Sequence, residues 1–219
     1  MRPQQERIFL LSPAFAGGRR AQMILNERAQ FELAKKLRSK RGARITEVFT
    51  FLSGLYFRGK IAYASAFADP PGACPGVLVI TTCRGLLTPE TIVGLEDLKL
   101  FAKREICETD EAFSLPFARD VRALAECSGP GTDVILLGSI ATGKYLKVLL
   151  KHLGPRLKFP RDFVGRGDMS RGGLLLRNAE EGIELDCISA EGAVLHGERP
   201  PKLAARRHGR PGPGRKETK

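Results

Sequence analysis

The sequence predicts an α/β fold with a mainly parallel sheet and helices on both of its faces. Short apolar runs at residues 7–12, 77–80 and 133–137 are separated by longer segments with helical periodicity. Strands that alternate with helices in this way are typical of βαβ units, whose parallel strands are buried on both faces. We predict one domain over residues 1–198, closed by a C-terminal hairpin, and a disordered basic tail over residues 199–219.

The remaining elements follow from periodicity and from helix and turn signals. Phe31, Ala34 and Leu37 recur at helical spacing. Thr88 and Pro89 fit an N-cap and a first helical position, so we expect a helix to begin there. Before it we predict a strand over 7–12, a loop over 13–20, a helix over 27–40, two helices over 45–68 broken near Ser53 and Gly54, a loop over 69–76 and the strand 77–80. After it we predict a helix over 114–127 with Pro116 in its first turn, the strand 133–137, a helix over 142–153, a short strand over 156–159, a helix over about 170–181 and a hairpin from 184–188 and 193–196.

Positive charge is concentrated at the two ends of the chain. The net charge is +12. Residues 1–44 hold eleven Lys and Arg against three Glu, and residues 199–219 hold eight against one, whereas the middle is nearly neutral. Such ends predict contact with a polyanion, DNA or RNA, although a basic tail also serves solubility.

The cysteines and the apolar runs predict a cytoplasmic protein. The five cysteines are scattered, odd in number and never spaced C-x-x-C, which argues against a disulfide framework and a zinc site. No apolar run approaches the roughly 20 residues of a membrane span, and the N-terminal run is too short for a signal peptide. We assign no metal, no cofactor and no membrane partner.

Polar and glycine-rich loops follow several predicted strands, where open α/β sheets place their ligand crevice. We expect the loops 12–20, 81–85, 138–144 and 165–173 to converge on one pocket of nucleotide size. The candidate anion- or nucleotide-binding residues are Ser12, Gly17, Gly18, Arg19, Thr82, Arg84, Gly85, Gly138, Ser139, Thr142, Gly143, Lys144, Arg166, Ser170 and Arg171.

Residues 138–144, GSIATGK, fit the phosphate-loop pattern G-x-x-x-x-G-K between a strand and a helix. Tyr145 stands where this pattern needs a magnesium-binding Ser or Thr, so we do not predict a nucleoside triphosphatase. Backbone N–H groups, the helix dipole and Lys144 would still suit a single phosphate.

Two further groups suggest chemistry. Arg166 and Arg171 would clamp a phosphate or carboxylate, while Asp168 or Ser170 either joins the site or caps the following helix. Glu90 and Asp168 are the candidate acid/base residues, although Glu90 would equally favour a helix N-terminus.

Cys83, next to Arg84 at the crevice position, is a candidate nucleophile whose pKa the guanidinium would lower. The alternative is an inert buried cysteine, and none of the three histidines lies in a loop suited to act as its base.

The first hundred residues resemble the YaaA-like peroxide-stress proteins and related uncharacterised bacterial domains. Leu11-Ser12-Pro13-Ala14 resembles the opening strand and S-P-A signature of that family, and residues 55–68 and 80–100 resemble its Tyr-rich helix and its Gly-Leu-Leu-x-Pro turn. Phe15 departs from the family, which carries lysine there, as do Glu96 and Asp97. The resemblance implies a cytoplasmic bacterial α/β domain linked to DNA binding or oxidative stress, with no reaction to transfer.

Our leading hypothesis is a nucleic-acid-associated protein with an anion- or nucleotide-binding crevice, linked to stress response. The alternative is a hydrolase or transferase acting on a nucleotide or nucleoside, and a third is a scaffold that binds another protein.

Overall fold

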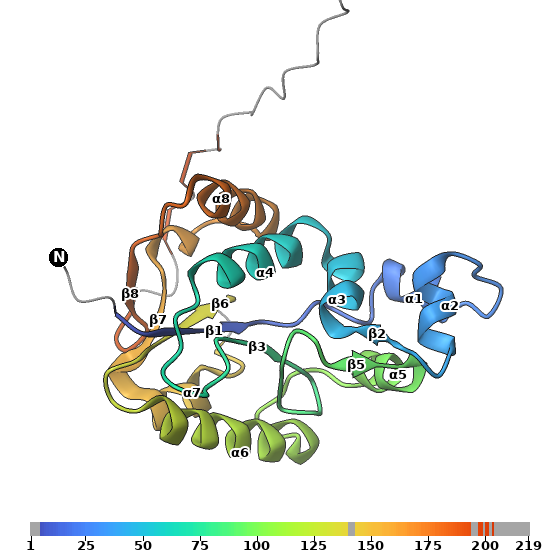
Figure 1. Cartoon of the computed structure of the whole chain (residues 1–219), viewed down its shortest axis with the longest axis horizontal. Helices are drawn as coiled ribbons and strands as arrows, with labels where there is room; N and C mark the ends of the chain where they lie inside the picture. The colour runs from blue at the N-terminus through green and yellow to red at the C-terminus, as the bar shows by residue number, and fades with distance from the viewer. Residues whose placement is uncertain (1–4, 140–142, 194–196, 199, 202, 204–219) are drawn as a thin grey trace, which may run out of the picture.

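A six-stranded, mostly parallel sheet forms the centre of the molecule (Figure 1). The computed structural model describes residues 5–139, 143–193, 197, 198, 200, 201 and 203. The central strands β3, β1, β6 and β7 are parallel, and β4 and β8 join the edges antiparallel. The strand order is β4 (Leu86–Leu87), β3 (Val77–Ile80), β1 (Arg7–Leu11), β6 (Asp133–Leu137), β7 (Leu157–Pro160) and β8 (Cys187–Ser189). The predicted fold class is confirmed.

Helices cover both faces of the sheet because its central strands are apolar on both faces. Phe9 and Leu11 pack into the core on one side, whereas Ile8 and Leu10 pack into the core on the other. The first face carries α3 (Ile45–Ser53), α4 (Leu55–Phe67) and α8 (Asp168–Glu181), and the second carries α6 (Glu111–Ser128) and α7 (Leu146–Leu153). Short 3-10 turns, Gly154–Arg156 and Arg161–Phe163, flank β7.

A smaller extension projects beyond the carboxyl end of β1, on the right in Figure 1. It consists of α1 (Arg19–Leu25), α2 (Glu32–Arg38), α5 (Leu95–Lys103) and a two-stranded sheet of β2 (Ala43–Arg44) and β5 (Ile92–Val93). Its apolar side chains, such as Leu37 and Leu98, join the same core as Phe9, so the extension is continuous with the domain.

The predicted break between α3 and α4 is confirmed. Gly54 adopts φ 60°, ψ −120°, a conformation that side chains strongly disfavour, and it separates the two helices.

The helix predicted to begin at Thr88 is wrong. Residues 88–91 form a turn, closed by Thr91 N–H donating to Thr88 O at 3.1 Å, and β5 follows. The helix α5 begins only at Leu95, where the Asp97 carboxylate accepts a hydrogen bond from Gly94 N–H at 2.9 Å. Asp97 thus supplies the N-terminal cap that we assigned to Thr88.

Other boundaries shift by a few residues. The helix α1 begins inside the predicted loop 13–20, and α6 begins at Glu111 with Asp110 as its N-cap, so Pro116 lies inside it. The helix α7 begins at Leu146, while residues 140–142 lie outside the described residues. Strand β8 pairs with β7. Of the predicted second hairpin arm, 193–196, the structure describes residue 193 alone, and of the predicted tail, 199–219, it describes residues 200, 201 and 203.

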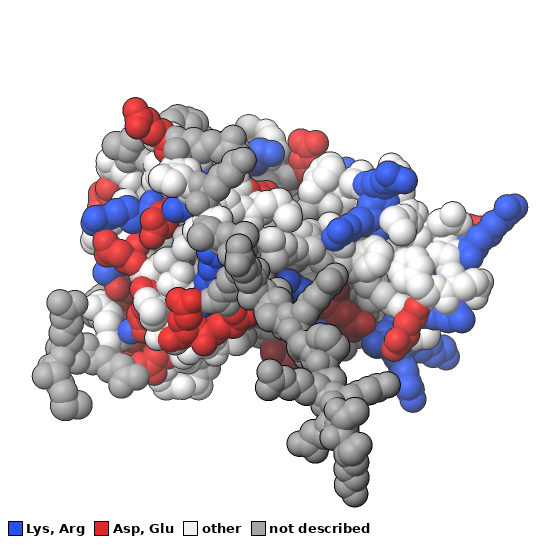
Figure 2. Space-filling view, turned by 90° about the horizontal axis from the view of Figure 1, so that it is seen from above, with Lys and Arg blue, Asp and Glu red and all other residues white. Residues whose placement is uncertain are grey.

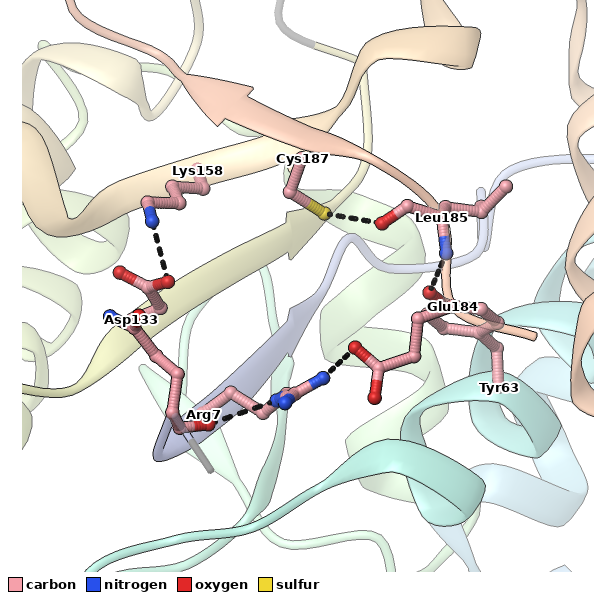
Figure 3. A network of polar contacts seen from close by, with 8 residues as sticks. Arg7, Tyr63, Asp133, Lys158, Glu184, Leu185 and Cys187 are labelled. Carbon is pink, nitrogen blue, oxygen red and sulfur yellow. Dashed lines mark hydrogen bonds and ion pairs between the residues drawn. The ribbon is translucent and has the colours of Figure 1, made fainter. Parts of the chain in front are cut away.

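A polar network lies at the amino ends of the strands, which is the end of the sheet opposite to the predicted crevice, and it joins them to α4 (Figure 3). Lys158 pairs with Asp133 at 2.6 Å, and Arg7 pairs with Glu184. The backbone N–H of Leu185 donates to the Tyr63 hydroxyl at 2.7 Å. These contacts fix the segment that leads into β8.

Cys74, in the loop before β3, forms a disulfide with Cys127 near the end of α6, with the Cα atoms 6.0 Å apart. The prediction that the scattered cysteines form no disulfide framework is therefore wrong for this pair, which joins residues 53 apart in sequence. No helix among the described residues is long and apolar enough to cross a membrane.

Candidate functional site

A cavity of about 650 Å³ lies where the carboxyl ends of β1, β3 and β6 meet the extension. The chain places β3 on one side of β1 and β6 on the other, so the cavity lies at the switch point where open α/β sheets bind ligands. We call it the crevice. It is lined by Ser12, Pro13, Ala14, Phe15, Ala16, Gly17, Gly18, Arg19, Arg20, Leu52, Ser53, Tyr56, Thr82, Phe101, Ala102, Arg104, Glu105, Ile106, Ser139, Lys144, Tyr145 and Asp168.

All four predicted loops contribute to this wall. The predicted residues that line it are Ser12, Gly17, Gly18, Arg19, Thr82, Ser139, Lys144 and Asp168. Gly138 lies beneath the floor, where a Cβ atom would come within 2.8 Å of both Ser12 Cβ and the Tyr145 hydroxyl. Thr142 lies outside the described residues, and Gly143, with φ 65°, does not line the crevice.

Arg84 and Gly85 do not face the crevice. The Arg84 guanidinium donates to the Asp97 carboxylate at 2.9 Å, which holds it beside α5, and Gly85 packs against Asp120 of α6. Arg84 instead lines a separate, shallower cavity of about 460 Å³ together with Cys83. Burial raises the pKa of the Cys83 thiol despite the nearby guanidinium, which is the opposite of what a nucleophilic cysteine needs.

The predicted clamp of Arg166 and Arg171 is also turned away from the crevice. Arg171 donates from Nε and Nη2 to the Phe163 carbonyl, at 3.2 and 2.9 Å. Arg166 contacts Ser170 Oγ and the Pro201 carbonyl, both at 3.3 Å. The Phe163 carbonyl therefore holds the Arg171 guanidinium, and Ser170 contacts Arg166, whose Nε is buried without a hydrogen-bond partner among the described residues.

The two candidate acid/base residues are separated. Asp168, the first residue of α8, lines the crevice, whereas Glu90 is exposed in the turn before β5 and lines neither cavity. Only Asp168 is placed to meet a ligand in the crevice.

The residue that sequence reasoning missed is Lys60. It lies on α4 directly behind Ser12, is 1% exposed, and donates from Nζ to the Ser12 carbonyl at 2.5 Å and to Ser12 Oγ at 3.0 Å. Its Nζ lies 4.4 Å from the centroid of the Tyr56 ring and 5.0 Å from that of Phe57. Burial lowers the pKa of Lys60 to about 7, with the Asp168 carboxylate opposing and the Arg171 guanidinium reinforcing that change.

Tyr145 and Tyr56 also contribute polar groups to the floor of the crevice. Tyr145 is 5% exposed, its hydroxyl donates to the Ser139 carbonyl at 3.1 Å and reaches the Ser12 side chain, and burial raises its pKa to about 12. The Tyr56 hydroxyl is buried without a hydrogen-bond partner among the described residues, and burial raises its pKa. A ligand in the crevice would supply that partner.

The rim of the crevice is cationic and carries one exposed aromatic ring. Arg19 and Lys144 are exposed and form no ion pair with residues that the structure describes, while Arg104 is paired with Asp110 at 3.0 Å. Phe15 is 73% exposed, and its ring lies over the backbone of Gly17. Within the described residues, no cluster of His, Cys, Asp and Glu side chains would hold a metal ion.

The rim continues into a basic surface on the extension. Figure 2 shows Lys and Arg gathered at the end of the molecule formed by α1 and α2, with few carboxylates among them. The exposed members of this α1–α2 surface are Arg19, Arg20, Arg28, Lys35, Arg38, Lys40, Arg41 and Arg44.

Comparisons with protein-family models, curated proteins and solved structures find no match. The resemblance to the YaaA-like proteins therefore stays a prediction.

Proposed function

We propose that the crevice binds a nucleotide unit, with its base stacked on Phe15 and its phosphate held by Arg19 and Lys144. The observation that carries this proposal is the exposed Phe15 ring beside Arg19 and Lys144, two cations with no ion-pair partner in the described part of the chain, at the switch point of the sheet. Aromatic rings bind bases of any sequence by stacking, and cations bind the phosphates between them.

The size and chemistry of the crevice support a nucleotide. Its volume of about 650 Å³ falls within the range of small-molecule sites. Its wall combines apolar contacts from Leu52 and Phe101 with polar groups that would fix a ribose or base.

The α1–α2 surface favours a nucleic acid as the source of that nucleotide. Nine Lys and Arg against two Glu lie between residues 19 and 44, and Arg19 and Arg20 belong both to this surface and to the crevice. A strand could follow the basic surface and place one nucleotide in the crevice. A free nucleotide is the other source of the same chemistry.

Titration of labelled oligothymidylate by fluorescence anisotropy, with AMP as competitor, tests the proposal. Phe15→Ala should weaken binding by roughly tenfold or more, since a stacked base contributes about 1–3 kcal/mol. Lys144→Ala should reduce the log–log salt slope by about 0.7, the contribution of one phosphate of a single strand.

Matched controls are Leu115→Ala, an exposed apolar side chain on α6, and Lys147→Ala, an exposed lysine on α7 outside the crevice wall. Neither should change the affinity measurably. Binding of AMP without binding of oligothymidylate would assign the free nucleotide as the ligand. Absence of binding to both at low salt would overturn the proposal.

A further inference from the structure

The contact between Ser12 and Lys60 at the floor of the crevice is the geometry of a nucleophile beside a base. Ser12 lines the crevice at the end of β1, where its Oγ accepts a hydrogen bond from Lys60 Nζ at 3.0 Å and donates to the Leu137 carbonyl at 3.3 Å; a neutral Nζ can instead accept the hydroxyl proton across the same distance. Such a distance permits direct proton transfer. We propose that Ser12 and Lys60 act as nucleophile and general base in acyl transfer, cleaving a carboxylic ester carried by a molecule that enters the crevice.

The fold builds this pair from elements that are distant in sequence. Lys60 is held on the buried face of α4, and Gly59 next to it lets α8 approach so closely that a Cβ there would lie 2.6 Å from Gly172 O. The packing encloses the amine completely, while Ser12 keeps an opening toward the crevice.

The protonation state suits the role of a base. The titratable and charged groups that act on Lys60 are Tyr56 on its own helix and Asp168 and Arg171 on α8. Burial outweighs the Asp168 carboxylate and lowers the pKa of Lys60 to about 7, so a large share of the amine is neutral near neutral pH. A neutral Nζ carries the lone pair that an ammonium lacks.

The reaction would proceed in two balanced steps. Lys60 takes the proton of the Ser12 hydroxyl as Oγ bonds to the ester carbonyl carbon; the C–O bond to the alcohol breaks, and the alcohol leaves with the proton returned from Lys60. Water then attacks the acyl-serine, giving its proton to Lys60, and the carboxylic acid leaves as Ser12 Oγ recovers that proton. The only co-reactant is water.

Diisopropyl fluorophosphate tests the nucleophile without knowledge of the natural substrate. Ser12 Oγ should displace fluoride and gain a diisopropylphosphoryl group, which is detected by intact mass and localised to Ser12 by peptide mapping. The labelling rate should rise with pH through a midpoint near 7, because the neutral amine is the reacting base. Hydrolysis of 4-nitrophenyl acetate should follow the same profile and stop on labelling.

Ser12→Ala should abolish labelling, and Lys60→Met should slow it by at least about 100-fold, a typical contribution of a general base. Ser65→Ala, which removes an exposed hydroxyl on α4 outside the crevice wall, should label as the parent does. Circular dichroism establishes that each variant is folded. If Lys60→Met unfolds, Lys60→Arg supplies the comparison, since a guanidinium stays charged and cannot act as the base.

A folded parent protein that is not labelled, or that is labelled at several serines with equal rates, would overturn the inference. It depends on access through the crevice but not on the identity of the ligand. Labelling at Ser12 without nucleotide binding would therefore reject only the proposed function, and nucleotide binding without labelling would reject only the Ser12–Lys60 pair.

Discussion

Lys60 is the residue whose environment departs most from ordinary protein chemistry. Enclosing an amine costs free energy unless its donors are matched, and here two are matched by Ser12 while the rings of Tyr56 and Phe57 favour the charge. The lowered pKa shows that these contacts do not fully replace water. Such an uncompensated group is more typical of functional sites than of structural cores.

This incomplete compensation predicts an unusual pH dependence of stability. The unfolded lysine titrates near 10.5 and the folded one near 7, so between these values the unfolded chain binds the extra proton. The free energy of unfolding should therefore rise with pH from 7 toward 10.5, by up to about 1.4 kcal/mol per pH unit. Lys60→Met should remove this component.

Urea unfolding of both proteins at several pH values within this window gives the comparison, and the difference between them cancels other titrating groups. Parallel pH profiles for the parent and Lys60→Met would contradict a lowered pKa at this position.

The signal for Lys60 was present in the sequence but ambiguous. Tyr56, Lys60 and Tyr63 recur at spacings of four and three, which places them on one helical face, and all three are buried. The overlapping face of Phe57, Ile61 and Ala64 has the same helical spacing, but Ile61 is only half-buried. Periodicity cannot separate these two overlapping faces, because α4 is covered by the sheet on one side and by α8 on another.

The crossing of α4 and α8 is the element-level feature on which the crevice depends. Gly172 faces Leu55 and Tyr56 so closely that a Cβ would lie 2.7 Å from Leu55 O and 2.8 Å from Tyr56 Cα. Only two glycines, Gly59 and Gly172, allow this approach. This close approach of α8 to α4 places Asp168 and Tyr56 together in the wall of the crevice.

Gly172→Ala should destabilise the protein by about 1–3 kcal/mol. The added methyl group would clash with backbone atoms of Leu55 and Tyr56, which can move only if the whole helix α4 shifts. Gly173→Ala is the matched control: it lies on the same helix, where a Cβ would meet only Leu203 Cδ1 at an ordinary 3.5 Å. Urea midpoints measure both variants. Equal effects of the two substitutions would show that helix–helix distance is not the cause.

Element boundaries were predictable where local signals agreed with packing. Gly54 and Gly182 ended helices as expected, since both adopt positive φ. Thr88 and Pro89 wrongly predicted a helix start, because the same local pattern also suits a turn. The turn forms because β5, which follows it, pairs with β2 about fifty residues upstream. Tertiary contacts of this kind produce no signal in the local sequence.

For the whole molecule, the Cys74–Cys127 pair closes a large loop and so adds to stability. A sequence separation of 53 residues predicts a contribution of about 4 kcal/mol from the restricted unfolded state. A reducing agent, or Cys127→Ser, should therefore lower the melting temperature, whereas Cys107→Ser, at an exposed free thiol, should not. Alkylation of all five thiols in the unreduced, unfolded protein would contradict the pairing.

The position of the crevice followed from topology, but its chemistry did not. The carboxyl ends of parallel strands meet at one edge, so four loops could be expected to gather there. Which side chains enter the cavity depends on partners that only the folded chain supplies: Asp97 holds Arg84 away, and the Phe163 carbonyl holds Arg171. Lys144, without such a partner among the described residues, stays at the rim.

The position of α8 late in the chain has a consequence for biosynthesis. Lys60 and Tyr56 emerge from the ribosome more than a hundred residues before Gly172, the residue through which α8 packs closely on α4. Until α8 has been synthesised and docks on α4, the amine stays exposed to water, which favours its charged form. The lowered pKa of Lys60 therefore requires the packed α4–α8 pair and would be absent from a nascent chain that lacks α8.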